Sequence, residues 1–266
     1  MSTRALRTAA SGMYAQQINI EVVSNNIANI NTTGYKKNKA GFQDLMYQEV
    51  HINPLTSATQ GTEEISTSKI QIGNGVKPGA STKIFAQGDI TPTNNQLDLA
   101  IQGEGFFQLR KPDGTFAYTR DGSFKINADG KIVTSGGLPL EPGLTLNSDI
   151  VNFKIGTDGS VTAQDVSGGS SPLGTIEVAR FMNNGGLMAL GDNLYSETAA
   201  SGQPILGSPG QQGFGEVHQG FLEASNVDIV EEMIAMIVAQ RAYEINSKTV
   251  KTVEEMMTMA NNLKRI

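Results

Sequence analysis

The chain has 266 residues, a formal net charge of −6, no Cys, no Trp and only 2 His. The absence of Cys excludes a disulfide framework, a thiolate metal site and a cysteine nucleophile. Two His leave little material for a metal site, so no cofactor is expected. Because nucleic-acid binding needs a basic face, the acidic balance argues against a nucleic-acid partner. The one dense basic run, Lys36, Lys37 and Lys39, is expected to be a solvated loop.

Glycine and proline divide the chain into parts. Of the 30 Gly, 27 lie between Gly61 and Gly220, and all 9 Pro lie between Pro54 and Pro209. Both residue types interrupt regular structure, so two uninterrupted ends should flank a turn-rich middle. We expect a helical unit built from residues 1–34 and 221–266, a linker or arm over 35–75, and a β-rich unit over 76–220.

The first end carries the pattern of a long amphipathic helix. Four apolar residues recur every seven positions, and Val23 adds one position between them. The candidate seam is Leu6, Met13, Ile20, Val23 and Ile27. This spacing is typical of a helix that packs along a narrow seam. The helix should end near residues 29–34, where Gly34 can adopt a left-handed conformation.

The last end has a second helical pattern. Apolar residues recur at spacings of mostly three and four, and the candidate seam is Ile234, Ile237, Ile245, Val253 and Met256. Ser225, with Asp228 three residues later, predicts a capped start. The adjacent acids Glu231 and Glu232 diverge by about 100° on a helix and are expected on a solvated face.

The two ends complement each other in charge. Residues 1–36 carry a net charge of +2, and residues 221–266 carry −2. The simplest arrangement pairs the two helices as a coiled coil, and separate packing of each helix on the middle unit is the alternative.

The middle of the chain has the pattern of short antiparallel strands. Residues 124–127 alternate apolar and polar, and Asp-Gly pairs at 113–114 and 129–130 predict turns between such runs. A small sandwich or barrel-like unit is expected, which makes the whole chain α+β. Residues 48–75 are polar and irregular and indicate a long loop or extended arm. We find no phosphate loop, nucleophile elbow or calcium loop, so the chain is not expected to be an enzyme.

Several runs of residues resemble one known family. They are residues 22–36 (VVSNNIANINTTGYK), 101–107 (IQGEGFF), 118–124 (YTRDGSF) and 240–248 (QRAYEINSK). In this order they are similar to signatures of the bacterial flagellar axial proteins, the rod and hook family. The resemblance implies that three amides late in the first helix, Asn25, Asn26 and Asn29, act in assembly with the two candidate seams. It also gives Gly34 a role as a backbone hinge.

The resemblance implies a structural function. Subunits of this family leave the cell through the flagellar export apparatus without a cleavable signal and stack into a hollow helical tube. The tube transmits motor torque to the hook and passes exported subunits. The terminal helices would line the tube, with their apolar stripes buried by neighbouring copies and largely exposed in a monomer. The implied partners are other copies of the chain, proximal rod proteins, hook or hook-junction proteins, envelope ring proteins and the export apparatus.

One segment suggests which type of family member the chain is. Residues 47–68, beginning with Tyr47 and Gln48, resemble an insertion carried by members of the distal rod and lacking in hook proteins. The expected location is therefore the basal body, in the periplasmic rod that runs toward the outer membrane. A hook or proximal-rod subunit is one alternative. An envelope glycan-binding module on a helical stalk is another. No apolar run is long enough to span a membrane.

Overall fold

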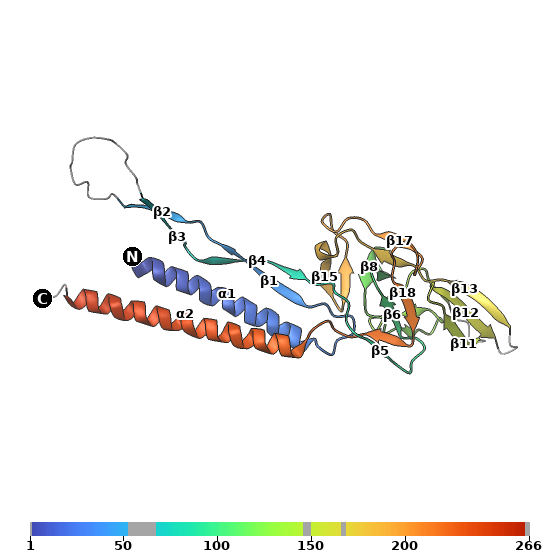
Figure 1. Cartoon of the computed structure of the whole chain (residues 1–266). Coiled ribbons are helices and arrows are strands. Elements are labelled where there is room, and N and C mark those ends of the chain that lie inside the picture. Colours follow the sequence, from blue (N-terminus) through green and yellow to red (C-terminus); the bar gives the residue numbers. More distant parts are fainter. Residues whose placement is uncertain (1, 53–67, 146–149, 166–168, 264–266) are drawn as a thin grey trace, which may run out of the picture. The chain divides into compact units, whose positions relative to one another are not determined.

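The computed structural model describes residues 2–52, 68–145, 150–165 and 169–263 (Figure 1). Helices occupy both ends and antiparallel strands lie between them, which confirms the α+β class. The chain forms two compact units. The helical unit holds residues 1–25, 38–82 and 230–266, and the β unit holds residues 26–37 and 83–229.

The helical unit contains two long helices, α1 (Ser2–Ala28) and α2 (Ile229–Leu263). At 1.5 Å per residue, the 35 residues of α2 extend about 52 Å. The predicted start at Ser225 is wrong. The Ser225 hydroxyl accepts a hydrogen bond from the Val227 N–H at 3.4 Å, and regular helix begins only at Ile229.

Small residues bring α1 and α2 together. A Cβ atom added to Gly12 would lie 2.9 Å from Nδ2 of Asn246. Ala15 and Ala239 are both buried. The two helices therefore approach closely where side chains are short.

Two strand pairs complete the helical unit. Strand β1 (Asn38–Asp44) pairs with β4 (Val76–Lys83), and β2 (Gln48–Ile52) pairs antiparallel with β3 (Ser68–Ile72). The expectation of a long loop over 48–75 is thus wrong at its two ends, because residues that are distant in sequence pair there, and the alternative of an extended arm stays a prediction. Residues 53–67, which make up most of the predicted insertion, lie outside the described residues.

The β unit is built on one six-stranded sheet with strand order β15-β16-β8-β7-β14-β17. Its strands, in chain order, are β7 (Phe106–Arg110), β8 (Phe116–Thr119), β14 (Val178–Arg180), β15 (Met188–Gly191), β16 (Leu194–Ser196) and β17 (Ile205–Gly207). A short 3-10 helix, η1 (Asn184–Gly186), precedes β15. All five neighbouring pairs in this sheet are antiparallel.

Smaller sheets surround the six-stranded sheet. Three strands pair in the order β11-β12-β13, and three further pairs are β18-β6, β19-β5 and β10-β9. Their bounds are β5 (Ile90–Pro92), β6 (Leu99–Gln102), β9 (Lys125–Ile126), β10 (Ile132–Val133), β11 (Ile150–Ile155), β12 (Ser160–Asp165), β13 (Ser170–Thr175), β18 (Glu216–Gln219) and β19 (Phe221–Glu223).

Two adjacent aromatic residues of β7 supply both cores of the β unit. Successive side chains of a strand point to opposite faces of its sheet. Phe107 joins the larger apolar cluster and meets Phe124 edge to face at 5.2 Å. Phe106 joins the second cluster and meets Phe181 at 5.8 Å. The sheet therefore buries apolar residues on both faces.

The predicted turns lie where the Asp-Gly pairs place them. Gly114 and Gly130 have φ of 78° and 76°, and each closes a turn between polar residues. Glycine adopts these left-handed conformations without a steric penalty. The local turn chemistry of the sequence is thus confirmed at both positions.

Candidate functional site: an exposed helix face and a buried ion cluster

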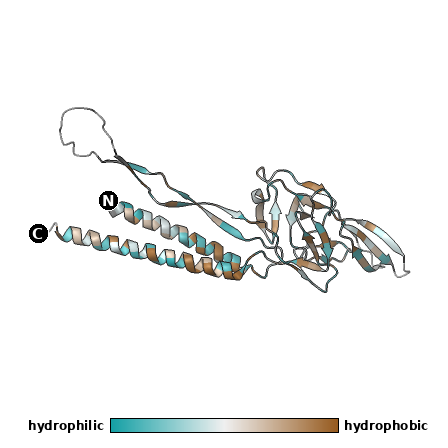
Figure 2. Cartoon of the chain, in the orientation of Figure 1, coloured by the Kyte–Doolittle hydropathy of each residue, from teal (hydrophilic) through white to brown (hydrophobic). Residues whose placement is uncertain are grey.

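Helix α2 carries a stripe of exposed apolar side chains. Eight of them share one side of the helix at spacings that return to the same face, and each is between 55% and 76% exposed. We call this set the apolar stripe: Val230, Ile234, Ile237, Val238, Ile245, Met256, Met259 and Leu263. Figure 2 shows the hydrophobic colour running along α2, most densely over its first half.

The opposite side of α2 is buried. Glu232 and Ala239, seven residues apart, are both buried. The expectation of a solvated Glu232 is therefore wrong, since it lies on the buried face rather than with exposed Glu231. A helix that packs on one side and exposes large aliphatic residues on the other has a face available for a protein contact.

The two predicted seams differ in how far their side chains are exposed. Of the second seam, Ile234, Ile237, Ile245 and Met256 are exposed members of the apolar stripe, and Val253 is half-buried. Of the first seam, Val23 is buried, whereas Leu6, Met13, Ile20 and Ile27 are half-buried. The second seam is thus not buried within one copy of the chain.

The three amides near the end of α1 also differ from one another. Asn26 is buried, and its Oδ1 accepts a hydrogen bond from the Tyr35 hydroxyl at 3.2 Å. Asn29 is half-buried and accepts a hydrogen bond from the Thr32 hydroxyl at 3.2 Å, while Asn25 is exposed. The bonds of Asn26 to Tyr35 and of Asn29 to Thr32 lie within a single copy, so an assembly role for these residues stays a prediction.

The predicted insertion begins on exposed residues. Tyr47 is 57% exposed, and its ring lies 3.5 Å from the position of a Cβ atom on Gly73. Gln48 is exposed and begins β2, opposite Ile72 of β3.

A buried ion cluster lies in the β unit. It consists of Lys36, Arg120 and Glu223, each 5% exposed or less. Glu223 Oε1 lies 2.5 Å from Lys36 Nζ, and its Oε2 lies 3.2 Å from Arg120 Nη1. The Glu223 Oε1 also accepts a hydrogen bond from the Gly88 N–H at 3.0 Å. One carboxylate thus compensates two buried cations.

The position of Lys36 contradicts the expected solvated loop. Burial lowers the pKa of the Lys36 ammonium, and the Glu223 carboxylate acts in the opposite direction. The partner is 187 residues away in sequence, so the basic run gave no sign of it. Arg120 completes the site by donating to the Gly103 carbonyl at 2.7 Å.

Next to the ion cluster, hydrogen bonds join the segment that follows α1 to the segment that precedes α2. The Gly34 N–H donates to the Glu223 carbonyl at 2.8 Å, and the Lys37 N–H donates to Asn226 Oδ1 at 2.7 Å. Asn226 also donates through Nδ2 to the Ile84 carbonyl at 2.8 Å. The segment after α1 and the segment before α2 are therefore held by direct bonds.

Gly34 has the predicted left-handed conformation, with φ of 65°. A Cβ atom there would lie 2.7 Å from the backbone of Arg120. We expect Gly34→Ala to lower the free energy of unfolding by about 2–4 kcal/mol, measured by urea denaturation. Gly114→Ala is the matched control, because Gly114 has φ of 78° but open space around its Cβ position. Equal losses in the two variants would contradict a packing role for Gly34.

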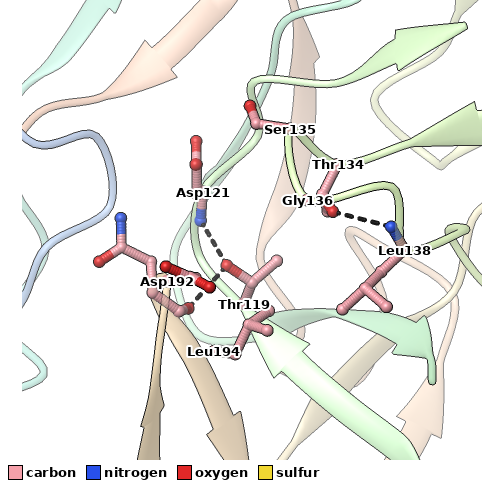
Figure 3. Close-up of a pocket in the computed structure, with 9 residues that line it drawn as sticks. Thr119, Asp121, Thr134, Ser135, Gly136, Leu138, Asp192 and Leu194 are labelled. Carbon is pink, nitrogen blue, oxygen red and sulfur yellow. Dashed lines mark hydrogen bonds between the residues drawn. The ribbon is translucent and has the colours of Figure 1, made fainter. Parts of the chain in front are cut away.

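A pocket of about 570 Å³ opens in the β unit (Figure 3). Its lining residues are Thr119, Asp121, Thr134, Ser135, Gly136, Leu138, Asp192, Asn193 and Leu194. The Thr119 hydroxyl accepts from the Asp121 N–H and donates to the Asn193 carbonyl, and the Thr134 hydroxyl accepts from the Leu138 N–H. These bonds hold turns in the pocket wall. Asp121 and Asp192 are the ionisable residues among the described lining residues, and they lie just after β8 and just before β16.

Comparison with known proteins agrees with this geometry. Residues 6–36 match the family "Flagella basal body rod protein", residues 100–163 match "Flagellar hook protein FlgE/F/G D1 domain", and residues 218–263 match "Flagellar basal body rod FlgEFG protein C-terminal". The flagellar basal-body rod protein FlgG of Borreliella burgdorferi is 49% identical, over 98% of this chain and 99% of that protein. The chain belongs to the flagellar basal-body rod protein family.

Relatives in other bacteria match this chain over a similar share of their length. FlgG of Caulobacter vibrioides is 47% identical and FlgG of Bacillus subtilis 39% identical, each over 98% of this chain and 99% of the relative. A flagellar basal-body rod protein is a structural subunit and not an enzyme. The family therefore confirms the expected structural function and the expectation that the chain is not an enzyme. Neither helix is long and apolar enough, over the residues described, to cross a membrane.

Proposed function

We propose that the chain is a subunit of the distal flagellar rod, whose copies stack head to tail into a hollow helical tube. The tube transmits motor torque to the hook and passes exported subunits. The observation that carries this proposal is the apolar stripe of α2, which is exposed in a single copy. A contact between different surfaces of identical subunits propagates as an open helical filament when its rotation does not close into a ring.

The helices supply the assembly contact in this proposal. Leu6, Met13 and Ile20 of α1 are half-buried and form one seam in a coiled coil with α2. Ile234 and Ile237 face neighbouring copies, which bury them in the tube. Fully burying one such side chain contributes about 1.5–3 kcal/mol, so several per copy can hold a subunit in a polymer.

The proposed location is the periplasmic part of the basal body, toward the outer membrane. The partners are other copies of the chain, proximal rod proteins, hook or hook-junction proteins, envelope ring proteins and the export apparatus. Support for the distal position comes from Tyr47 and Gln48, which begin the segment similar to the distal-rod insertion.

The proposal is tested by assembly of the purified chain. Concentrated protein is sedimented and the pellet viewed by electron microscopy. Hollow tubes of constant diameter, formed above a threshold concentration, are the expected result. Protein that remains monomeric or stops at a closed dimer at every concentration would overturn the proposal.

A further inference from the structure

Both edges of the six-stranded sheet are open and apolar. Strands β15 and β17 are the two ends of the strand order, so each has one neighbour in the sheet. On β15, Met188 is 54% and Leu190 is 42% exposed, and on β17, Ile205 is 46% and Leu206 is 44% exposed. An edge strand presents unpaired backbone N–H and C=O groups that another strand can satisfy.

Neither edge carries the charges that usually protect such strands. The sequences are MALG for β15 and ILG for β17. The surrounding residues 181–191 and 198–215 contain no Lys, Arg, Asp or Glu, although charged residues make up 17% of the chain. Natural proteins place Lys, Pro or inward-pointing charges at edges to block pairing between molecules. Here that protection is limited to strand shortness, a bulge in β15, and Pro204 and Pro209, which flank β17 without lying in it.

The directions of the two edge strands suit a repeating contact. Every neighbouring pair in the sheet is antiparallel, so across the six strands β15 and β17 run in opposite directions. When two copies lie side by side in the same orientation, β17 of one copy is therefore antiparallel to β15 of the next. Copies with one shared orientation are what a head-to-tail polymer requires.

We infer that β15 of one copy pairs antiparallel with β17 of a second copy of this chain. This inference rests on the proposed polymer and adds a second contact to it, made by the β units. The occupant of each edge is the other edge of an identical sheet, since both are uncharged, apolar and of opposite direction. Pairing of β15 with β15 would also be antiparallel, but it is two-fold and ends at a dimer.

The contact is too small to form alone. Strands β15 and β17 contain four and three residues. A pair of such length adds only a few hydrogen bonds, and the net contribution of each is small because the same groups bond to water in the monomer. Copies already joined through α2 hold the edges at a high effective concentration, which makes the second contact favourable. The edges are therefore expected to pair in the polymer and to remain apart in the monomer.

Because the chain has no Cys, cross-linking can test this pairing directly. Four double variants carry one Cys in β15, at Met188 or Leu190, and one in β17, at Ile205 or Leu206. Polymer and dilute monomer are treated with a short bis-maleimide and separated on a denaturing gel. The control is Asp113→Cys with Asp129→Cys, two exposed positions in turns.

At least one double variant should give a ladder of dimers, trimers and longer species in the polymer, and none in the monomer. The β15 single variants and the control should give no ladder. Tubes without a ladder from any double variant would overturn the edge pairing and leave the proposed function standing. Dimers from a single β15 variant would overturn it in favour of the two-fold contact, and absence of tubes would overturn both proposals.

Charged substitutions in the two edge strands test the pairing independently, through the threshold concentration for assembly. Leu190→Lys and Leu206→Lys should each raise the threshold concentration for assembly by about tenfold, the effect of losing one apolar contact. Lysine at the β15 position and glutamate at the β17 position of the double variant that cross-links should together restore much of the loss, because the two edges meet only between copies. Equal assembly of the single variants and the unchanged chain would contradict the pairing.

Discussion

Replacing Ile237 with aspartate is expected to abolish assembly at concentrations where the unchanged chain forms tubes. Ile237 is 55% exposed in one copy, so the change should leave the monomer folded. In the polymer it removes an apolar contact and buries an unpaired carboxylate, which together cost more than about 3 kcal/mol. The threshold concentration should therefore rise at least about 100-fold. Sedimentation at increasing concentration measures it.

Two variants control this experiment. Ile237→Leu keeps the apolar surface and should assemble nearly as the unchanged chain does. Gln240→Glu adds the same charge to an exposed position about 60° round the helix axis from Ile237. It should change the threshold much less than Ile237→Asp. Tubes from Ile237→Asp at the normal threshold would show that the apolar stripe does not make the assembly contact.

Replacing Glu223 with glutamine is expected to destabilise the β unit by about 3–5 kcal/mol, because it removes the carboxylate that contacts both buried cations. Natural domains have a total stability of only about 5–15 kcal/mol, so much of the β unit's stability depends on one carboxylate. Lys36→Met should cost less, since the Glu223 bond to Arg120 at 3.2 Å remains. Urea denaturation followed by circular dichroism measures each loss.

The matched control is Glu216→Gln, which makes the same change at an exposed residue of β18. It should alter the unfolding free energy by less than about 0.5 kcal/mol. A Glu223→Gln variant as stable as this control would contradict the role given to the ion cluster. A Lys36→Met variant less stable than Glu223→Gln would contradict the assignment of Glu223 as the shared partner.

The elements that depend on local chemistry could be predicted from the sequence. The helices follow from apolar spacing within a few turns, and the turns at Gly114 and Gly130 follow from Asp-Gly pairs. The left-handed conformation of Gly34 follows from the preference of glycine for positive φ.

Features that depend on distant partners could not be predicted. Lys36 is an ordinary surface lysine in its local sequence, and only the fold brings it to Glu223. The pairing of Gln48 with Ile72 likewise joins residues across a segment without a periodic pattern. The seven-residue repeat of α1 does not reveal that Gly12 and Asn246 mark a close approach, because backbone proximity depends on the partner helix.

The most direct test of the central claim is the accessibility of position 237 before and after assembly. Ile237→Cys places a single thiol in the apolar stripe of a chain that has none. Its reaction with a maleimide should be fast in the monomer and at least about tenfold slower in tubes, while Asp113→Cys, in an exposed turn, stays reactive in both. Equal reaction rates at position 237 in monomer and tubes would contradict assembly through this face of α2.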